Sequence, residues 1–197
     1  MILVSIGANL PGRDGAPALE TCRRAAAALD ALPGLRLRGL SRWFATAPVL
    51  AEGDAGRQPD YVNGVAHLVL APGAGAVAPA ALLARLMELE AVAGRVRSVR
   101  NAPRVLDLDI IAMGDLVRTA PDPVLPHPRA HERGFVLVPL GEIVPGWVHP
   151  VLGRSVEALI AALPPQLVRP LSCGRERSGV ERFGVARFGC EGLMRRL

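Results

Sequence analysis

Residues 104–111 read Arg-Val-Leu-Asp-Leu-Asp-Ile-Ile and stand between a proline and a nearby glycine. An apolar run rich in branched residues, bounded in this way, predicts a buried β-strand. Side chains on a strand alternate between its two faces, so Asp107 and Asp109 share one face. The opposite face is apolar and consists of Leu106, Leu108 and Ile110. The strand therefore offers one side to a hydrophobic core and two carboxylates on the other.

The paired carboxylates indicate a cation site. Two charges side by side on a mostly apolar strand repel each other and lose hydration, and a divalent ion between them offsets both costs. Mg²⁺ takes oxygen ligands and is commonly held by one or two carboxylates together with substrate phosphates. Aspartates at this spacing also occur at strand edges where they face water, but their apolar neighbours Val105 and Ile111 argue against that interpretation.

An arginine cluster stands directly before the strand. It consists of Arg95, Arg97, Arg100 and Arg104. Carboxylates for a metal beside arginines for phosphate are the composition of a phosphoryl-transfer site. The planar fork of arginine suits bidentate phosphate binding, and every basic residue of this chain other than histidine is an arginine.

The composition indicates one globular domain. The chain has 197 residues, of which 50% are hydrophobic, and this is enough for one domain with a core. No uninterrupted apolar run is long enough to span a bilayer, and the first residues lack the basic lead and length of a signal peptide. We therefore expect a cytoplasmic protein that does not bind membranes. The three cysteines are too few and too scattered for a disulfide framework or a zinc site, so free thiols are expected.

The positive charge is concentrated near the C-terminus. The formal net charge is +5, and residues 165–197 carry seven arginines against three glutamates, while residues 1–164 carry sixteen against fifteen acidic residues. This distribution argues against nucleic acid as a partner of the domain. We expect a domain over residues 1–164 and a basic, Gly/Arg-rich tail over residues 165–197. The tail contains a degenerate five-residue repeat with glycine in every unit, so it is expected to be disordered or loosely docked.

The order of predicted elements indicates an α+β fold. Apolar runs and alternation predict strands at 2–6, 35–44, 61–70 and 104–111, and a short returning strand around Val117. Amphipathic spacing predicts helices at 16–32, 80–92, 130–140 and 156–163, the second ended by Gly94. Strand–helix–strand, repeated twice, matches a ferredoxin-like α/β sandwich with a mainly antiparallel central sheet flanked by helices. The long loop at 47–59 is expected to be functional.

Four blocks of the chain carry distinctive motifs. They are Ser-Ile-Gly-Ala-Asn-Leu at 5–10, Thr-Ala-Pro at 46–48 with Gln-Pro-Asp-Tyr-Val-Asn at 58–63, Gly-Arg-Val-Arg at 94–97 with Pro-Arg-Val-Leu-Asp-Leu-Asp-Ile at 103–110, and Pro-His-Pro-Arg at 126–129 with Arg-Gly-Phe-Val-Leu-Val-Pro-Leu at 133–140. In this order they resemble the 6-hydroxymethyl-7,8-dihydropterin pyrophosphokinase family of folate biosynthesis. The resemblance runs from about residue 2 to residue 163 and leaves out the tail.

The resemblance implies that ATP gives a pyrophosphoryl group to the hydroxymethyl oxygen of the pterin and that AMP leaves. It implies that Asp107 and Asp109 hold two Mg²⁺ ions that bridge the ATP phosphates. Arg95 and Arg97 would lie on a mobile loop that closes over the phosphates, which makes them catalytic residues together with the two aspartates. The implied contacts to ATP are Glu90, Arg95, Arg104, Ile110, His127 and Arg133.

The second substrate is flat, and its aminopyrimidine edge carries both donors and acceptors. A pocket for it needs an aromatic wall and an amide. Asn63 supplies the amide, and Tyr61 and Phe135 are candidate walls. By resemblance, Thr46 and Val49 add contacts from the long loop. The expected partners are therefore ATP and 6-hydroxymethyl-7,8-dihydropterin, without nucleic acid or membrane, and a monomer is expected.

The chain departs from the family pattern in two places near the site. Asn101-Ala102 stand where the family usually has Trp-Gly, which bears on loop closure and rate, and Asp122 or a neighbour occupies a region where the family often has a basic residue. Three alternatives stay open. One is another metal-dependent nucleotidyl or phosphoryl transferase on the same fold, which would keep the carboxylates but not the pterin pocket. The others are a nucleic-acid-binding sandwich domain with a basic tail and a non-catalytic family member.

Overall fold

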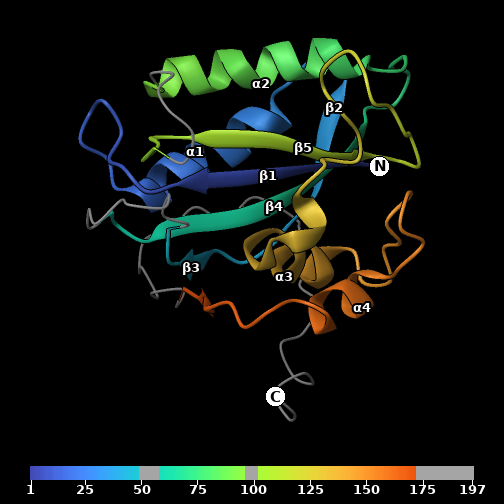
Figure 1. Cartoon of the computed structure of the whole chain (residues 1–197). Helices are drawn as coiled ribbons and strands as arrows, with labels where there is room; N and C mark the ends of the chain where they lie inside the picture. Colours follow the sequence, from blue (N-terminus) through green and yellow to red (C-terminus); the bar gives the residue numbers. More distant parts are fainter. Residues whose placement is uncertain (49–57, 96–101, 172–197) are drawn as a thin grey trace.

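The computed structural model describes residues 1–48, 58–95 and 102–171. In these ranges the chain forms six strands, four α-helices and one short 3-10 helix (Figure 1). The strands are β1 (Ile2–Ala8), β2 (Leu35–Leu40), β3 (Phe44–Thr46), β4 (Tyr61–Leu70), β5 (Asp107–Met113) and β6 (Val168–Pro170). The helices are α1 (Ala18–Asp30), α2 (Pro79–Ala93), η1 (Ala130–Glu132), α3 (Gly134–Ile143) and α4 (Val156–Ala161).

The strands form one antiparallel sheet in the order β5-β1-β4-β3-β6. The remaining strand, β2, lies on the same side of β4 as β3 and pairs with the C-terminal half of β4, whereas β3 pairs with its N-terminal end. The strand β4 is the longest, so it can pair with β1 along one edge and with β2 and β3 in succession along the other. This arrangement confirms the predicted α+β class with a mainly antiparallel sheet.

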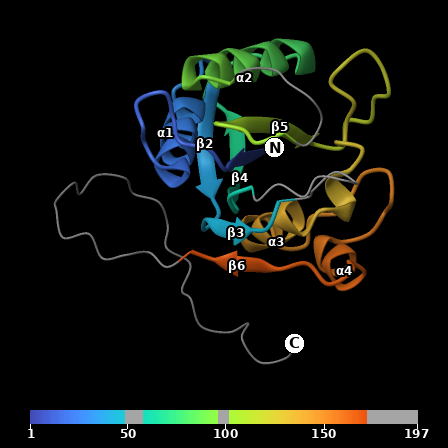
Figure 2. The ribbon, with the colours of Figure 1, turned by 60° about the vertical axis from the view of Figure 1, so that its left-hand side comes forward.

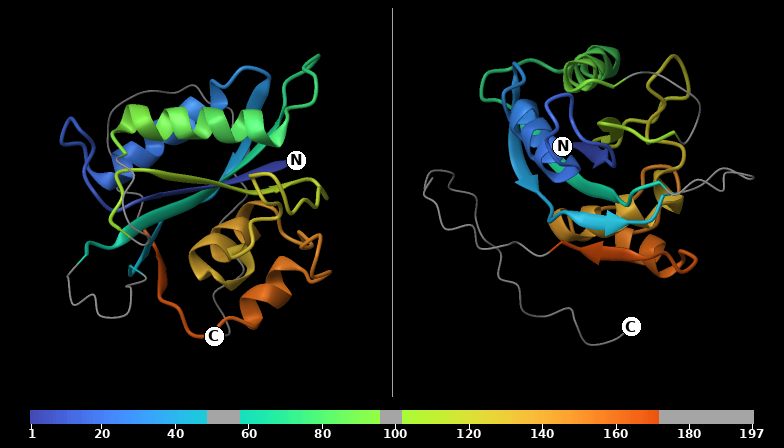
Figure 3. Two further views of the ribbon diagram at one scale, coloured as in Figure 1. Left: turned by 45° about the horizontal axis from the view of Figure 1, so that its top comes forward. Right: turned by 90° about the vertical axis from the view of Figure 1, so that its left-hand side faces the viewer.

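Helices cover both faces of the sheet. Figure 3 shows α1 and α2 on one side and α3 and α4 on the other. Each side has its own hydrophobic core, because alternate strand residues point in opposite directions. Val4, Ile6 and Leu108 pack toward α1 and α2. Leu3 and Val65 pack toward α3 and α4.

Several predicted elements differ from the structure in their limits. The strand predicted at 35–44 is divided, because Ser41 hydrogen-bonds to both backbone groups of Val65: its amide donates to the carbonyl, and its hydroxyl accepts from the amide, each at 3.0 Å. The strand predicted near Val117 is wrong, since that segment has only an isolated bridge between Arg118 and Leu125. The helix predicted at 130–140 is also divided, at Arg133, whose backbone is extended.

The second helix ends as predicted, at Gly94, which adopts the left-handed conformation (φ 103°) that caps a helix C-terminus. The strand β6 lies beyond the domain boundary that we expected at residue 164, and it pairs with β3 at the edge of the sheet (Figure 2). The rest of the expected tail, residues 172–197, lies outside the described residues. In the described ranges no helix is long and apolar enough to cross a membrane.

Candidate active site

The strand register brings the carboxylates and the amide to one face of the sheet. Gly7 on the central strand β1 pairs with Asn63 of β4 on one side and with Asp107 of β5 on the other. Two residues along, Ser5 pairs with Asp109. Paired residues in an antiparallel sheet point to the same side. All three polar side chains therefore lie on the face that α3 covers.

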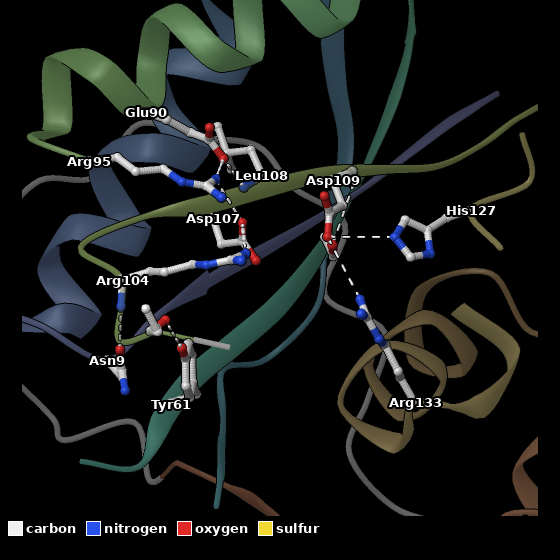
Figure 4. Close-up of polar contacts among 12 residues, drawn as sticks. Asn9, Tyr61, Glu90, Arg95, Arg104, Asp107, Leu108, Asp109, His127 and Arg133 are labelled. Carbon is white, nitrogen blue, oxygen red and sulfur yellow. Dashed lines mark hydrogen bonds and ion pairs between the residues drawn. The ribbon is translucent and has the colours of Figure 1, made fainter. Parts of the chain in front are cut away.

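Asp107 is surrounded by arginines (Figure 4). Its Oδ1 lies 2.7 Å from a guanidinium nitrogen of Arg95 and 2.6 Å from one of Arg104. The Asp107 side chain is 22% exposed, so it is within reach of a ligand from solvent. Arg95 and Arg104 come from the two ends of the segment that joins α2 to β5, which brings their charges together at the start of the strand.

Glu90 joins the end of α2 to this cluster. Its carboxylate accepts a hydrogen bond from the Leu108 backbone amide at 2.7 Å and forms an ion pair with Arg95. Glu90 is 5% exposed, and burial is the main reason why its pKa is raised. The residue thus fixes the free edge of β5 and the position of Arg95 at once. Its predicted contact to ATP stays a prediction.

Asp109 faces a second pair of basic groups. Its Oδ2 lies 3.9 Å from Nε2 of His127 and 3.8 Å from a guanidinium nitrogen of Arg133. Burial, followed by the charge of Asp107, raises the pKa of Asp109. Burial also lowers the pKa of His127. The basic groups thus approach from two sides, Arg95 and Arg104 at Asp107 and Arg133 and His127 at Asp109 (Figure 4).

The two carboxylates fit a hard divalent cation. They share one face, the charge of Asp107 helps to raise the pKa of Asp109, and Asp109 is 35% exposed at its side chain. Among the residues that the structure describes, no group of three or more His, Cys, Asp or Glu side chains could hold a metal ion. A site with two protein carboxylates suits Mg²⁺, which commonly completes its shell with water and substrate phosphates.

Asn9, which belongs to the first of the four motif blocks, fixes the two loops that flank the site. Its side-chain oxygen accepts from the Arg104 amide at 2.7 Å, and its side-chain nitrogen donates to the Pro59 carbonyl at 3.2 Å. The Asn9 and Leu10 amides both donate to the Arg104 carbonyl. The β1 loop therefore holds the backbone of a predicted phosphate-binding arginine.

The predicted pterin residues lie beside this region. Asn63 is buried, and its Nδ2 donates to the Thr46 hydroxyl at 2.7 Å. The Tyr61 hydroxyl donates to the Ala102 carbonyl at 3.3 Å, and burial raises the pKa of Tyr61. Phe135 is half-buried at the start of α3, and the Arg133 guanidinium lies 5.5 Å from its ring centroid.

A glycine that the sequence analysis did not single out separates the two parts of the site. A Cβ atom on Gly7 would lie 2.9 Å from Oδ1 of Asn63 and 4.0 Å from Cβ of Asp107. A glycine inside a strand commonly marks such a close approach, and this signal was present in the sequence.

One predicted residue of the described ranges does not join the cluster. Ile110 packs in the core on the opposite face of β5, so its side chain does not reach the carboxylates. Val49 and Arg97 lie outside the described residues, as does Asn101.

Comparison with known proteins gives one family. A model of the 7,8-dihydro-6-hydroxymethylpterin-pyrophosphokinase family matches residues 3–145. A Synechocystis sp. protein named 2-amino-4-hydroxy-6-hydroxymethyldihydropteridine pyrophosphokinase is 34% identical over 177 residues, which cover 90% of this chain and 83% of the relative. A Pseudomonas aeruginosa protein of the same name is 37% identical over 163 residues, which cover 83% of this chain and 91% of the relative.

Solved structures show the same fold. The Plasmodium falciparum HPPK-DHPS triple mutant with SDX-DHP matches with a TM-score of 0.58 at 12% identity. The match covers 81% of this chain but 43% of that one, so the present chain corresponds to less than half of the longer protein. The wild-type protein with STZ-DHP matches with a TM-score of 0.56 at 12% identity, over 81% of this chain and 40% of that one.

Proposed function

The chain belongs to the 7,8-dihydro-6-hydroxymethylpterin-pyrophosphokinase family, and we propose that the sheet face with Asp107, Asp109 and Asn63 is where its two substrates meet. The chain is a transferase of folate biosynthesis that moves pyrophosphate from ATP to the hydroxymethyl group of 6-hydroxymethyl-7,8-dihydropterin. A bond forms between the hydroxymethyl oxygen and the β-phosphorus while the hydroxyl proton is released, the bond from that phosphorus to the oxygen of the α-phosphate breaks, and AMP leaves.

The basic groups around the carboxylates support a phosphate site. Arg95 and Arg104 stand at Asp107 and Arg133 stands at Asp109, so positive charge converges on this face from both ends. His127, whose pKa is lowered by burial, adds an imidazole group beside Asp109. Phosphoryl transfer needs little covalent help from the protein, because positioning and neutralisation of charge account for most of the catalysis. These four side chains orient the ATP phosphates and stabilise charge that develops on them.

The same carboxylates support a site for two Mg²⁺ ions. Asp107 and Asp109 would hold them, and the ions would supply charge neutralisation for the phosphates when bound. The arginines that contact Asp107 have a second role, since they also serve as its counter-ions. Glu90 keeps Arg95 close to the strand through its ion pair.

The buried amide supports a pterin site on the same face. Asn63 is fixed by its hydrogen bond to Thr46, so its remaining donor and acceptor capacity has a defined direction. Tyr61 and Phe135 supply flat surfaces from β4 and from the start of α3. The register relation of Asn63 to Asp107 through Gly7 is the single observation that carries the proposal, because the amide and this carboxylate lie in one cross-strand row on the same face of the sheet.

The monomeric state and the cytoplasmic location stay predictions.

The test is AMP formation from ATP and Mg²⁺, measured with and without 6-hydroxymethyl-7,8-dihydropterin. We expect pterin-dependent AMP in the wild type and a loss of at least 100-fold in Asp107→Ala, as is common when a charge-stabilising group is removed from such a site. Asp115→Ala is the matched control, because Asp115 is an exposed aspartate that follows the same strand. Equal rates in Asp107→Ala and Asp115→Ala would overturn the proposed site, and a folded wild type without activity would favour the non-catalytic alternative.

A further inference from the structure

The chain after α4 returns to the sheet as a strap, residues 164–171. Its last part is β6, which pairs with β3 so that Val168 stands opposite Thr46. The Leu171 amide donates to the Trp43 carbonyl at 2.8 Å, which extends the pairing by one residue. Figure 2 shows β6 along β3, with the strap running to it from α4. The strap lies beyond residues 3–145, which the family model matches.

Gln166 in the strap holds the backbone on both sides of Arg133. Its side-chain oxygen accepts from the Gly134 amide at 2.8 Å, and its side-chain nitrogen donates to the Glu132 carbonyl at 3.1 Å. A Cβ atom on Gly134 would lie 2.9 Å from that oxygen, so a glycine is needed for the close approach. The side-chain amide of Gln166 thus accepts a hydrogen bond from one neighbour of Arg133 and donates a hydrogen bond to the other.

This contact replaces a local helix cap. The first amides of a helix have no partner within the helix and are commonly satisfied by a side chain of the preceding residue. Arg133 precedes α3 and makes no such contact. Gln166, which is 32 positions away in sequence, supplies the acceptor instead. An arginine side chain has donors only and could not accept from this amide. The Arg133 guanidinium extends instead toward Asp109, at 3.8 Å.

We propose that Gln166 is a positioning residue for Arg133 in the nucleotide site, an inference that rests on the proposed function for the role of Arg133. The backbone of Arg133 is extended between η1 and α3; its amide donates to the Ala130 carbonyl, and its carbonyl accepts from the amides of Val136 and Leu137. These bonds hold Arg133 to each helix separately, whereas Gln166 joins Glu132 on one side of the junction to Gly134 on the other. The two hydrogen bonds from Gln166 limit rotation at this junction. They thereby set the direction in which the guanidinium leaves the backbone.

The test measures direct binding of MgATP and, separately, of 6-hydroxymethyl-7,8-dihydropterin by calorimetry, together with thermal unfolding. We expect Gln166→Ala to weaken MgATP binding about two- to tenfold, the effect of roughly one hydrogen bond, while pterin binding stays unchanged. Gln166→Glu keeps an acceptor for the Gly134 amide but loses the donor, so we expect it to recover part of the affinity. Gln166 is exposed, so neither variant leaves a cavity in the core.

A double-mutant cycle with Arg133→Ala separates positioning from a general structural effect. If Gln166 acts through Arg133, adding Gln166→Ala to Arg133→Ala causes no further loss of MgATP affinity. Arg169→Ala is the control in the same strap, because it removes only an exposed ion pair with Asp60 at 3.2 Å, and it should leave MgATP binding unchanged.

Three outcomes would overturn the proposal: additive losses in the cycle, unchanged MgATP affinity in Gln166→Ala, or equal weakening of both ligands. Because the readout is binding, it is independent of turnover. A wild type that binds MgATP but forms no AMP would count against the proposed function and would leave the role of Gln166 measurable.

Discussion

Substitution of Gly7 by alanine tests whether the two parts of the site depend on their close approach across β1. Gly7 lies within a regular strand, so alanine there introduces no backbone strain of the kind that a positive φ would cause. Its new Cβ would lie 2.9 Å from Oδ1 of Asn63, whereas ordinary contacts to a Cβ begin at 3.4 Å. The amide must therefore move by about half an ångström.

That movement should affect pterin binding more than ATP binding. The Asn63 amide is held by a bond of 2.7 Å to Thr46, and a shift of half an ångström weakens this bond or redirects the amide. A misdirected hydrogen bond costs about 0.5–1.5 kcal/mol, which corresponds to a roughly two- to thirteenfold rise in the KM for the pterin. The Cβ would be 4.0 Å from Cβ of Asp107, an ordinary contact, so the KM for ATP should stay unchanged.

The assay is steady-state AMP formation with each substrate varied in turn, supported by thermal unfolding to confirm that the variant is folded. Gly39→Ala is the matched control, because Gly39 lies in β2 and an added Cβ there meets nothing within 4 Å. An unchanged KM for the pterin in Gly7→Ala, or an equal rise for both substrates, would refute the reasoning. The same rise in Gly39→Ala would show that the effect is not local.

Two further predictions concern buried ionisable groups. Glu90→Ala should lower the free energy of unfolding by about 1–3 kcal/mol, because the Leu108 amide and Arg95 lose their partner. Urea unfolding measures this change, with Glu88→Ala, at an exposed position of the same helix, as the control. Equal stability of the two variants would contradict the prediction. Burial, and then His131, lowers the pKa of His149, so the folded state binds fewer protons and stability should fall as pH drops below about 6.5. His149 Nδ1 accepts hydrogen bonds from two backbone amides, and the side-chain oxygen of asparagine can accept them as well. We therefore expect the melting temperature of His149→Asn to depend less on pH between 7 and 5 than that of the wild type. The same pH dependence in both proteins would count against the prediction.

The sequence predicted the elements with strong periodicity. The strand β4 has the predicted limits, and Asn63 and Val65 fall on the same face, as expected for a period of two residues. The alternation on β5 likewise predicted that Asp107 and Asp109 share a face, which the register to β1 confirms. The local pattern is sufficient in these cases because alternate residues of a strand face opposite sides of the sheet.

Contacts between distant segments could not be predicted from local pattern. The hydrogen bonds that Ser41 makes with Val65, which end β2, and the hydrogen bonds of Asn9 to Arg104 join residues far apart in sequence. The strand β6 is three residues long and pairs only because β3 offers a free edge. No periodicity marks such a strand, so it was included in the tail.

The central claim, that Asp107 and Asp109 hold two metal ions, is tested most directly by counting bound Mn²⁺. Mn²⁺ replaces Mg²⁺ at oxygen sites, and electron paramagnetic resonance distinguishes free from bound Mn²⁺. The titration would use an ATP analogue with a methylene group between the α- and β-phosphorus, so that transfer cannot occur. We predict two bound ions per chain in the wild type and in Asp115→Ala, and loss of bound metal in Asp107→Ala and Asp109→Ala. Two tightly bound ions in either of these last variants would contradict the assignment of the carboxylates.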